Sequence, residues 1–259
     1  MNNKIRLAIS MDGNEIWNEE ELNQYFNDAA LYDACHVVSL AESEEEDYDA
    51  VLNLAKESNA DNAYSLLYIG NGVKISTLKV ANTKPTADDI IALATTMHKT
   101  LRRDFLITNP RIAVLSNDAE PENAEESIVK PALENLFQSN IQCFGPYQPA
   151  TFFEEKQYDC FDALLVINGN EAMKFVNDND IKPIAWAMDT PKIIVSAPEA
   201  DATNLAEIVF TIAKSFNKRK SYDEAYSNPL PKLYHEQKEG EDRRPRFAPL
   251  EFMKKKDEQ

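Results

Sequence analysis

The side chains of this sequence that could do chemistry are carboxylates and hydroxyls placed just after short apolar runs. Three such runs, Arg111–Ser116, Ala163–Ile167 and Ile193–Ser196, have the length and composition of buried strands. In open α/β sheets, ligands bind outside the carboxyl ends of the strands. We therefore expect a cleft bordered by the loops after these runs. Its candidate residues are Asn117, Asp118, Glu120, Glu171, Ser196, Glu199 and Asp201.

Histidine and cysteine form no pattern that predicts catalysis or metal binding. We expect structural or surface roles for the three histidines, His36, His98 and His235. The three cysteines, which are Cys35, Cys143 and Cys160, form an odd set that predicts reduced thiols rather than a disulfide frame. An apolar run follows Cys160, which predicts that this side chain is buried. The chain also has no G-x-G-x-x-G fingerprint for a dinucleotide.

Composition excludes several classes of function. The formal net charge of the 259 residues is −17, which argues against nucleic-acid binding, because that needs a basic face. The acidity most simply serves solubility. No apolar run approaches the roughly 20 residues of a membrane helix, and the amino terminus lacks the apolar core of a signal peptide. We therefore expect a cytoplasmic protein without a membrane partner.

Strands and helices alternate along most of the chain, which predicts an α/β fold with a mostly parallel sheet and flanking helices. Asn18 with Glu21, and Thr86 with Asp89, have the spacing of capping boxes at helix starts. Further strands are expected over Ile5–Ser10, His36–Leu40, Ala63–Ile69, Val73–Thr77 and Pro183–Met188. Asn71-Gly72 predicts a hairpin turn.

The remaining elements are expected as follows. Val51, Leu54 and Ala55 have helical spacing and predict a short helix. A helix entered at Asn123 should be kinked by Pro131, and Gly145-Pro146 predicts a bend. A last helix, capped by Asp201, has its apolar positions at Leu205, Ile208, Val209, Ile212 and Phe216.

Four segments of the central stretch carry a resemblance to a known family. They read PRIAVLSNDAE, EESIVKPALENL, FGPYQPATFF and YDCFDALLV. Together they resemble PdxA, the 4-hydroxythreonine-4-phosphate dehydrogenase family of vitamin B6 biosynthesis. The resemblance covers about residues 84–234. It implies an architecture like that of isocitrate and isopropylmalate dehydrogenases, here truncated in the N-terminal half. It also implies a homodimer with NAD and a divalent metal as cofactors.

The chain departs from the family where the family binds its ligands. The resemblance implies three metal-binding histidines; two of their positions hold Thr83 and Gly169, and the third motif is missing. Threonine and glycine side chains cannot replace imidazole as metal ligands. In a further motif, Ile194 replaces an arginine and Glu199 a histidine, while Ser196 is kept. We therefore expect no catalytic residues, no metal site and no cofactor.

The resemblance divides the chain into three regions. Residues 1–105 are expected to form a shortened N-terminal α/β region, residues 106–234 a PdxA-like α/β core, and residues 235–259 a charged, disordered tail.

Two hypotheses follow, and they leave the question of enzymatic activity open. In the first, the protein is a PdxA-like scaffold without dehydrogenase chemistry. It binds a small anionic metabolite or a partner chain, such as a full-length family member, and is itself a homodimer. In the second, an active NAD-dependent dehydrogenase uses a rebuilt metal site. Its ligands would be carboxylates, which suit a hard cation such as Mg²⁺. They are Asp118, Glu120, Glu171, Glu199 and Asp201. A third reading, a purely structural or interaction protein, stays open beside them.

Overall fold

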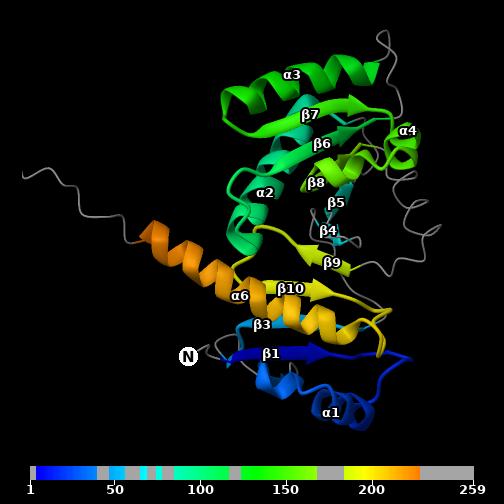
Figure 1. The fold of residues 1–259 in the computed structure, drawn as a ribbon, viewed down its shortest axis with the longest axis vertical. Helices are drawn as coiled ribbons and strands as arrows, with labels where there is room; N and C mark the ends of the chain where they lie inside the picture. Colours follow the sequence, from blue (N-terminus) through cyan, green and yellow to red (C-terminus); the bar gives the residue numbers. More distant parts are fainter. Residues whose placement is uncertain are drawn as a thin grey trace, which may run out of the picture.

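The structure is a computed structural model that describes residues 4–39, 47–55, 65–68, 74–77, 85–116, 124–167 and 184–227. Its described strands form one ten-stranded sheet in the order β2-β1-β3-β10-β9-β4-β5-β8-β6-β7 (Figure 1). The strands are β1 (Ile5–Ser10), β2 (Cys35–Ser39), β3 (Ala50–Asn53), β4 (Ser65–Tyr68), β5 (Lys74–Thr77), β6 (Arg111–Leu115), β7 (Gln142–Tyr147), β8 (Ala163–Val166), β9 (Ile184–Ala187) and β10 (Ile193–Ser196).

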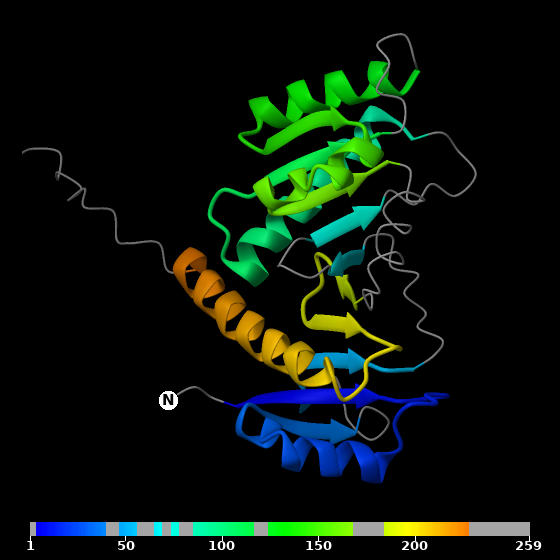
Figure 2. The same cartoon turned by 45° about the vertical axis from the view of Figure 1, so that its right-hand side comes forward.

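The sheet consists of two parallel blocks joined by antiparallel strands. β2, β1, β3 and β10 form one block, and β5, β8, β6 and β7 form the other. The steps from β10 through β9 and β4 to β5 are antiparallel. The prediction of a mostly parallel sheet is therefore confirmed. Figures 1 and 2 show the arrowheads of β1, β3 and β10 on the same side of the molecule as those of β6 and β7.

Helices cover both faces of the sheet. They are α1 (Glu19–Asp28), α2 (Ala87–Phe105), α3 (Ala124–Gln138), α4 (Pro149–Glu154) and α6 (Leu205–Ser227), with the short 3₁₀ turns η1 (Leu31–Asp33) and η5 (Gln157–Cys160). The main core joins buried side chains of α1, α2, α3 and α6 to one face of the sheet. A smaller, aromatic-rich core lies under α4 on the other face. No helix in the described part of the chain is long and apolar enough to span a bilayer.

The sequence signals for helix starts and for the hairpin are confirmed. Both capping boxes are present, at the starts of α1 and α2. β4 and β5 pair antiparallel, as the hairpin signal predicted, while the turn itself lies outside the described residues. α3 passes through Pro131 without interruption. α6 extends to Ser227, eleven residues beyond the last predicted apolar position at Phe216.

Two local predictions, the helix near Val51 and the burial of Cys160, are wrong. The predicted short helix near Val51 is the central strand β3, which is only four residues long and is paired on both sides, with β1 and β10. The bend predicted at Gly145-Pro146 coincides with an irregularity inside β7, where the peptide bond is cis and the register against β6 shifts. Cys160 is exposed rather than buried, because it lies in the turn η5 before β8 begins. All three cysteines are free thiols, as expected.

Candidate functional site at the carboxyl ends of the strands

A row of polar side chains crosses the carboxyl ends of three parallel strands. Ser10 of β1 is in register with Asn53 of β3, which in turn is in register with Ser196 of β10. The preceding position of each strand contributes to the main core, so the polar row lies on the opposite face of the sheet. Sequence reasoning identified Ser196 but missed the other two. Their signal was a polar residue that closes an apolar run.

Ser196 carries the least satisfied side chain of this row. It is 8% exposed, and its Oγ atom has no hydrogen-bond partner among the residues that the structure describes. Its neighbour Asn53 accepts a hydrogen bond at Oδ1 from the backbone N–H of Ala55 at 2.9 Å. A buried hydroxyl without a partner costs about 1–3 kcal/mol, so it is a natural place for a ligand or a bound water molecule.

Two of the predicted carboxylates border the end of β10. Glu199 is exposed. Asp201 accepts hydrogen bonds at Oδ1 from the backbone N–H of Thr203 at 2.9 Å and from its hydroxyl at 2.6 Å. Asn204 completes this turn by accepting the N–H of Asp201 at 3.0 Å. Asp201 therefore organises the turn that precedes α6, which is close to its predicted capping role.

Of the predicted acids, only Glu199 and Asp201 lie among the described residues, and they do not form a metal site there. No group of three or more His, Cys, Asp or Glu side chains that could hold a metal occurs among the described residues. Asn117, Asp118, Glu120 and Glu171 lie outside those residues, so the predicted convergence of the loops stays a prediction. His36 is exposed and His98 is half-buried on α2, where burial and the charge of Arg102 lower its pKa.

A cavity of about 540 Å³ adjoins the polar row at the carboxyl end of β1. It lies between β1, β2 and α1, and two carboxylates, those of Asp12 and Glu19, line it together with Ser10. Its wall includes Tyr32, whose hydroxyl donates a hydrogen bond to Asn23 Oδ1 at 2.9 Å. Because none of the described residues that line this cavity is a cation, it favours a neutral polar ligand over a free anion.

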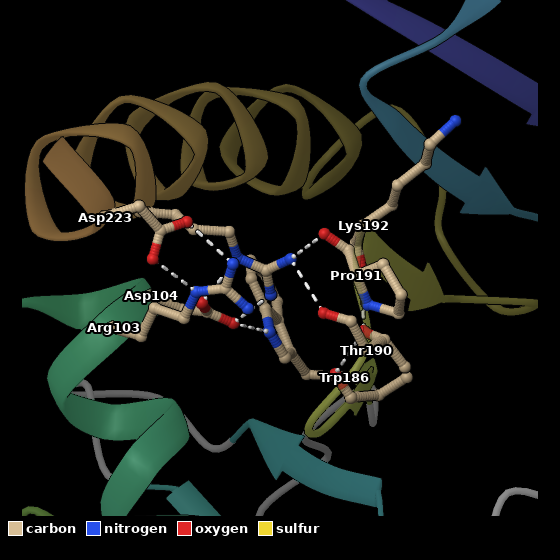
Figure 3. A network of polar contacts seen from close by, with 9 residues as sticks. Arg103, Asp104, Trp186, Thr190, Pro191, Lys192 and Asp223 are labelled. Atoms are coloured by element: carbon tan, nitrogen blue, oxygen red, sulfur yellow. Dashed lines mark hydrogen bonds and ion pairs between the residues drawn. The ribbon is translucent and has the colours of Figure 1, made fainter. Parts of the chain in front are cut away.

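A buried ion pair holds the chain together at the amino end of β10, away from the polar row. Asp104 of α2 accepts two hydrogen bonds from Arg219 of α6, both at 2.7 Å, and one from Trp186 Nε1 at 3.1 Å. The side chains of the pair are 2% and 7% exposed. Nη1 of Arg219 donates to the backbone carbonyls of Thr190 and Pro191 at 3.1 Å. Figure 3 shows how Asp104, Trp186 and the turn at Thr190 converge.

Two further contacts surround this ion pair. Arg103 pairs with Asp223 at 2.7 Å, on the more exposed side of the helix contact (Figure 3). The ring of Phe105 packs against Trp186 at a tilt of 49°, with 5.1 Å between the centroids, and lies 4.4 Å from Nζ of Lys74. Lys74 is 7% exposed, and burial lowers its pKa to about 8. These contacts join the helices of the two parallel blocks and have a structural role.

Comparison with known proteins gives a family match over half of the chain. The family model described as "Pyridoxal phosphate biosynthetic protein PdxA" matches residues 42–177. This match starts upstream of the predicted boundary at residue 84 and ends before residue 234. It includes the central strands β6 and β8 and all four segments that carried the resemblance.

Two relatives have the same printed name. A 4-hydroxythreonine-4-phosphate dehydrogenase of Bacteroides thetaiotaomicron is 24% identical over 164 residues, which cover 56% of this chain and 45% of that protein. One of Xanthomonas axonopodis pv. citri is 29% identical over 119 residues, which cover 42% of this chain and 37% of that protein. The chain thus spans less than half the length of the curated relatives that it matches.

Solved structures show the same fold at low sequence identity. A 4-hydroxythreonine-4-phosphate dehydrogenase from Burkholderia phymatum superposes with a TM-score of 0.63 at 11% identity, covering 83% of this chain and 99% of that chain. A branched-chain phosphotransacylase from Enterococcus faecalis V583 has a TM-score of 0.52 at 13% identity, with 82% and 99% covered. These likenesses concern the fold alone.

Proposed function

Because the chain belongs to the PdxA family, we propose that it is a binding member of that family that does not carry out metal- and NAD-dependent dehydrogenation. One observation carries the proposal. The positions that match two of the family's metal-binding histidines hold Thr83 and Gly169. Neither side chain offers an imidazole nitrogen or a carboxylate to a metal ion. The family's metal therefore does not fit this chain through the family's own ligands.

The end of β10 supports the same proposal. Ile194, at the position of the family's arginine, is half-buried within the strand and in register with Val51 of β3. Glu199, at the position of a histidine, is an exposed carboxylate. A carboxylate in place of a cation repels a phosphate group rather than holding it. Ser196, the residue kept from this motif, has a buried hydroxyl that a ligand could use.

The polar row and the cavity beside it suit a ligand that is polar and uncharged. Hydroxyl and amide groups of the polar row can form hydrogen bonds with it, and the acids Asp12, Glu19 and Glu199 disfavour a free anion nearby. A small anionic metabolite would have to bind elsewhere. A partner chain, such as a full-length family member, is the other proposed occupant, and a homodimer is proposed from the family relationship.

The test is a titration of thermal stability by candidate ligands. The purified protein is heated with NAD, NADH, Mg²⁺, Zn²⁺ and phosphorylated vitamin B6 precursors, each alone and in pairs. A ligand at about 100 times its Kd stabilises the fold by about 2.7 kcal/mol, which is a measurable shift. We expect no shift with NAD and a metal, and no NAD reduction with 4-hydroxythreonine-4-phosphate.

A shift that needs NAD and a metal together would overturn the proposal. It would favour the second hypothesis, an active enzyme with a carboxylate metal site. The variants Asp118→Asn and Glu171→Gln would then abolish the metal-dependent shift. Glu134→Gln, an exposed carboxylate on α3, is the matched control because it changes the charge equally at a distant position.

A further inference from the structure

A groove with the opposite electrostatic character lies at the other end of β1 from the polar row. It has a volume of about 560 Å³ and lies between α6, η1 and the end of α2. Its α6 wall consists of Phe210, Ala213, Lys214, Asn217, Lys218 and Ser221. From the first of these to the last, at 1.5 Å per residue, this wall is about 16 Å long. Such an elongated wall fits a segment of polypeptide better than a compact metabolite.

The groove gathers positive charge on an otherwise acidic protein. Among the described residues, Lys4, Lys214 and Lys218 line it with a single acid, Asp33, whereas the net charge of the chain is −17. None of the three lysines forms an ion pair with a carboxylate in the part of the chain that the structure describes. Lys4 donates to the backbone carbonyl of Tyr32 at 2.7 Å. The groove therefore has ammonium groups to offer to an acidic partner.

The charge of Lys218 is repelled by that of Lys214. Its Nζ donates to the backbone carbonyl of Phe105 at 2.9 Å. Burial and the nearby charge of Lys214 lower its pKa. A carboxylate placed between the two ammonium groups would relieve this repulsion.

Two exposed apolar side chains stand in the same groove. Phe210 is 49% exposed and Leu106 is 45% exposed. Leu106 ends α2 in the left-handed region, with φ +54°, where glycine is usual. A leucine at this position costs backbone strain. The groove thus combines apolar side chains and cations. Phe210, Lys214 and Lys218 lie on α6, and Leu106 and Lys4 line it from other segments.

We propose that this groove binds an acidic amphipathic helix of a partner protein. Apolar side chains of that helix pack on Phe210 and Leu106, and its carboxylates contact the three lysines. Binding of an amphipathic helix in a groove is a common mode of recognition. The segment of this chain that follows α6 is a poorer match, because residues 228–259 contain eight Lys and Arg against seven Asp and Glu. The proposal is independent of whether the strand-end site is catalytic.

The experiment uses the full-length protein and a designed probe. The probe is a fluorescently labelled 15-residue helical peptide with leucines along one face and glutamates beside them, and binding is followed by fluorescence anisotropy. We expect Phe210→Ser to weaken binding about tenfold, since it removes an apolar anchor. Lys214→Glu should weaken it about fivefold and reduce its dependence on salt concentration.

Matched controls separate the groove from the general surface. Lys220→Glu makes the same change of charge on the same helix, at an exposed position outside the groove. Phe137→Ser removes a phenylalanine that is 81% exposed on α3. Both controls should bind the peptide like the unmodified protein. All four variants change exposed residues, and circular dichroism confirms that each is folded.

Three outcomes would overturn the proposal. The first is that the peptide does not bind, and the second is that the control variants weaken binding as much as the groove variants do. The third is that sedimentation velocity of the protein alone shows self-association that Phe210→Ser abolishes. A second copy of the chain would then be the occupant of the groove.

Discussion

Removing the carboxylate of Asp104 should cost about 3–5 kcal/mol of the free energy of unfolding. That is the usual cost of breaking a buried ion pair by removing one partner. In this protein the carboxylate accepts three hydrogen bonds, two from Arg219 and one from Trp186. Asp104→Ala would leave the guanidinium 7% exposed with two backbone carbonyls as its remaining acceptors.

The loss of stability in Asp104→Ala comes mainly from the buried guanidinium of Arg219, which is left without its carboxylate, rather than from the net attraction of the pair. Asp104→Asn keeps the shape and can still accept hydrogen bonds, so it should fall between Asp104→Ala and the unmodified protein. Replacing both partners, as in Asp104→Leu with Arg219→Met, removes the buried charge and should cost less than the two single changes together. Urea unfolding followed by tryptophan fluorescence measures each value.

The neighbouring pair of Arg103 and Asp223 is the control. Its side chains are 33% and 47% exposed, so Asp223→Ala should cost no more than about 1 kcal/mol. Equal costs of Asp104→Ala and Asp223→Ala would contradict this expectation. A double replacement that costs the full sum of the single ones would contradict it too, because the loss would then not come from a buried charge left without its partner.

Three further predictions test other features of the structure. Burial lowers the pKa of Lys74 to about 8, so its ammonium group lowers the stability of the fold below pH 8. The free energy of unfolding should therefore rise as the pH increases from about 8 toward the pKa of the unfolded state. Lys74→Met should flatten this rise in urea titrations at pH 7–10.5. Iodoacetamide should alkylate Cys160 alone in the native protein, because burial raises the pKa of Cys35 to about 11 and that of Cys143 to about 12. Mass spectra that show all three cysteines modified would contradict the fold. Gly145→Ala should cost at least roughly 2 kcal/mol more than Gly13→Ala in thermal melts, because it forces the backbone to rearrange. A Cβ at Gly145 would lie 2.5 Å from the carbonyl oxygen of Val114, while a Cβ at Gly13 would meet open space. Equal melting temperatures of the two variants would show that β7 has a different backbone.

The elements with a signal local to themselves could be predicted from the sequence. The strands β6 and β8, the capping boxes of α1 and α2, and the β4–β5 hairpin pairing depend on residues within a few positions of one another. The short central strand β3 could not be recognised in this way. Four residues are too few to distinguish a period of 2 from one of 3.6, and its stability comes from pairing with β1 and β10.

The end of α6 and the ion pair at its centre had no local signal. The charged segment after Phe216 looked like the end of a helix, but Arg219 and Asp223 each bind a residue of α2 more than 100 positions away. Polar residues in a helix are ordinarily solvated, so their sequence pattern is the same whether they are exposed or buried in a pair. In the candidate site, Ser196 could be predicted because ligands bind at the carboxyl ends of strands. The positions of Ser10 and Asn53 beside it follow only from the register of the sheet.

The proposed loss of catalysis and the persistence of the fold have separate physical causes. The contacts that join the two parallel blocks lie at the amino end of β10, where Arg219 holds the turn at Thr190 and the carboxylate of Asp104. The family's ligand positions Thr83 and Gly169 lie outside the described residues. The described core and the buried pair consist of other residues. These described contacts do not involve a residue at a metal-ligand position, and stability measurements alone cannot reveal whether the protein is an enzyme.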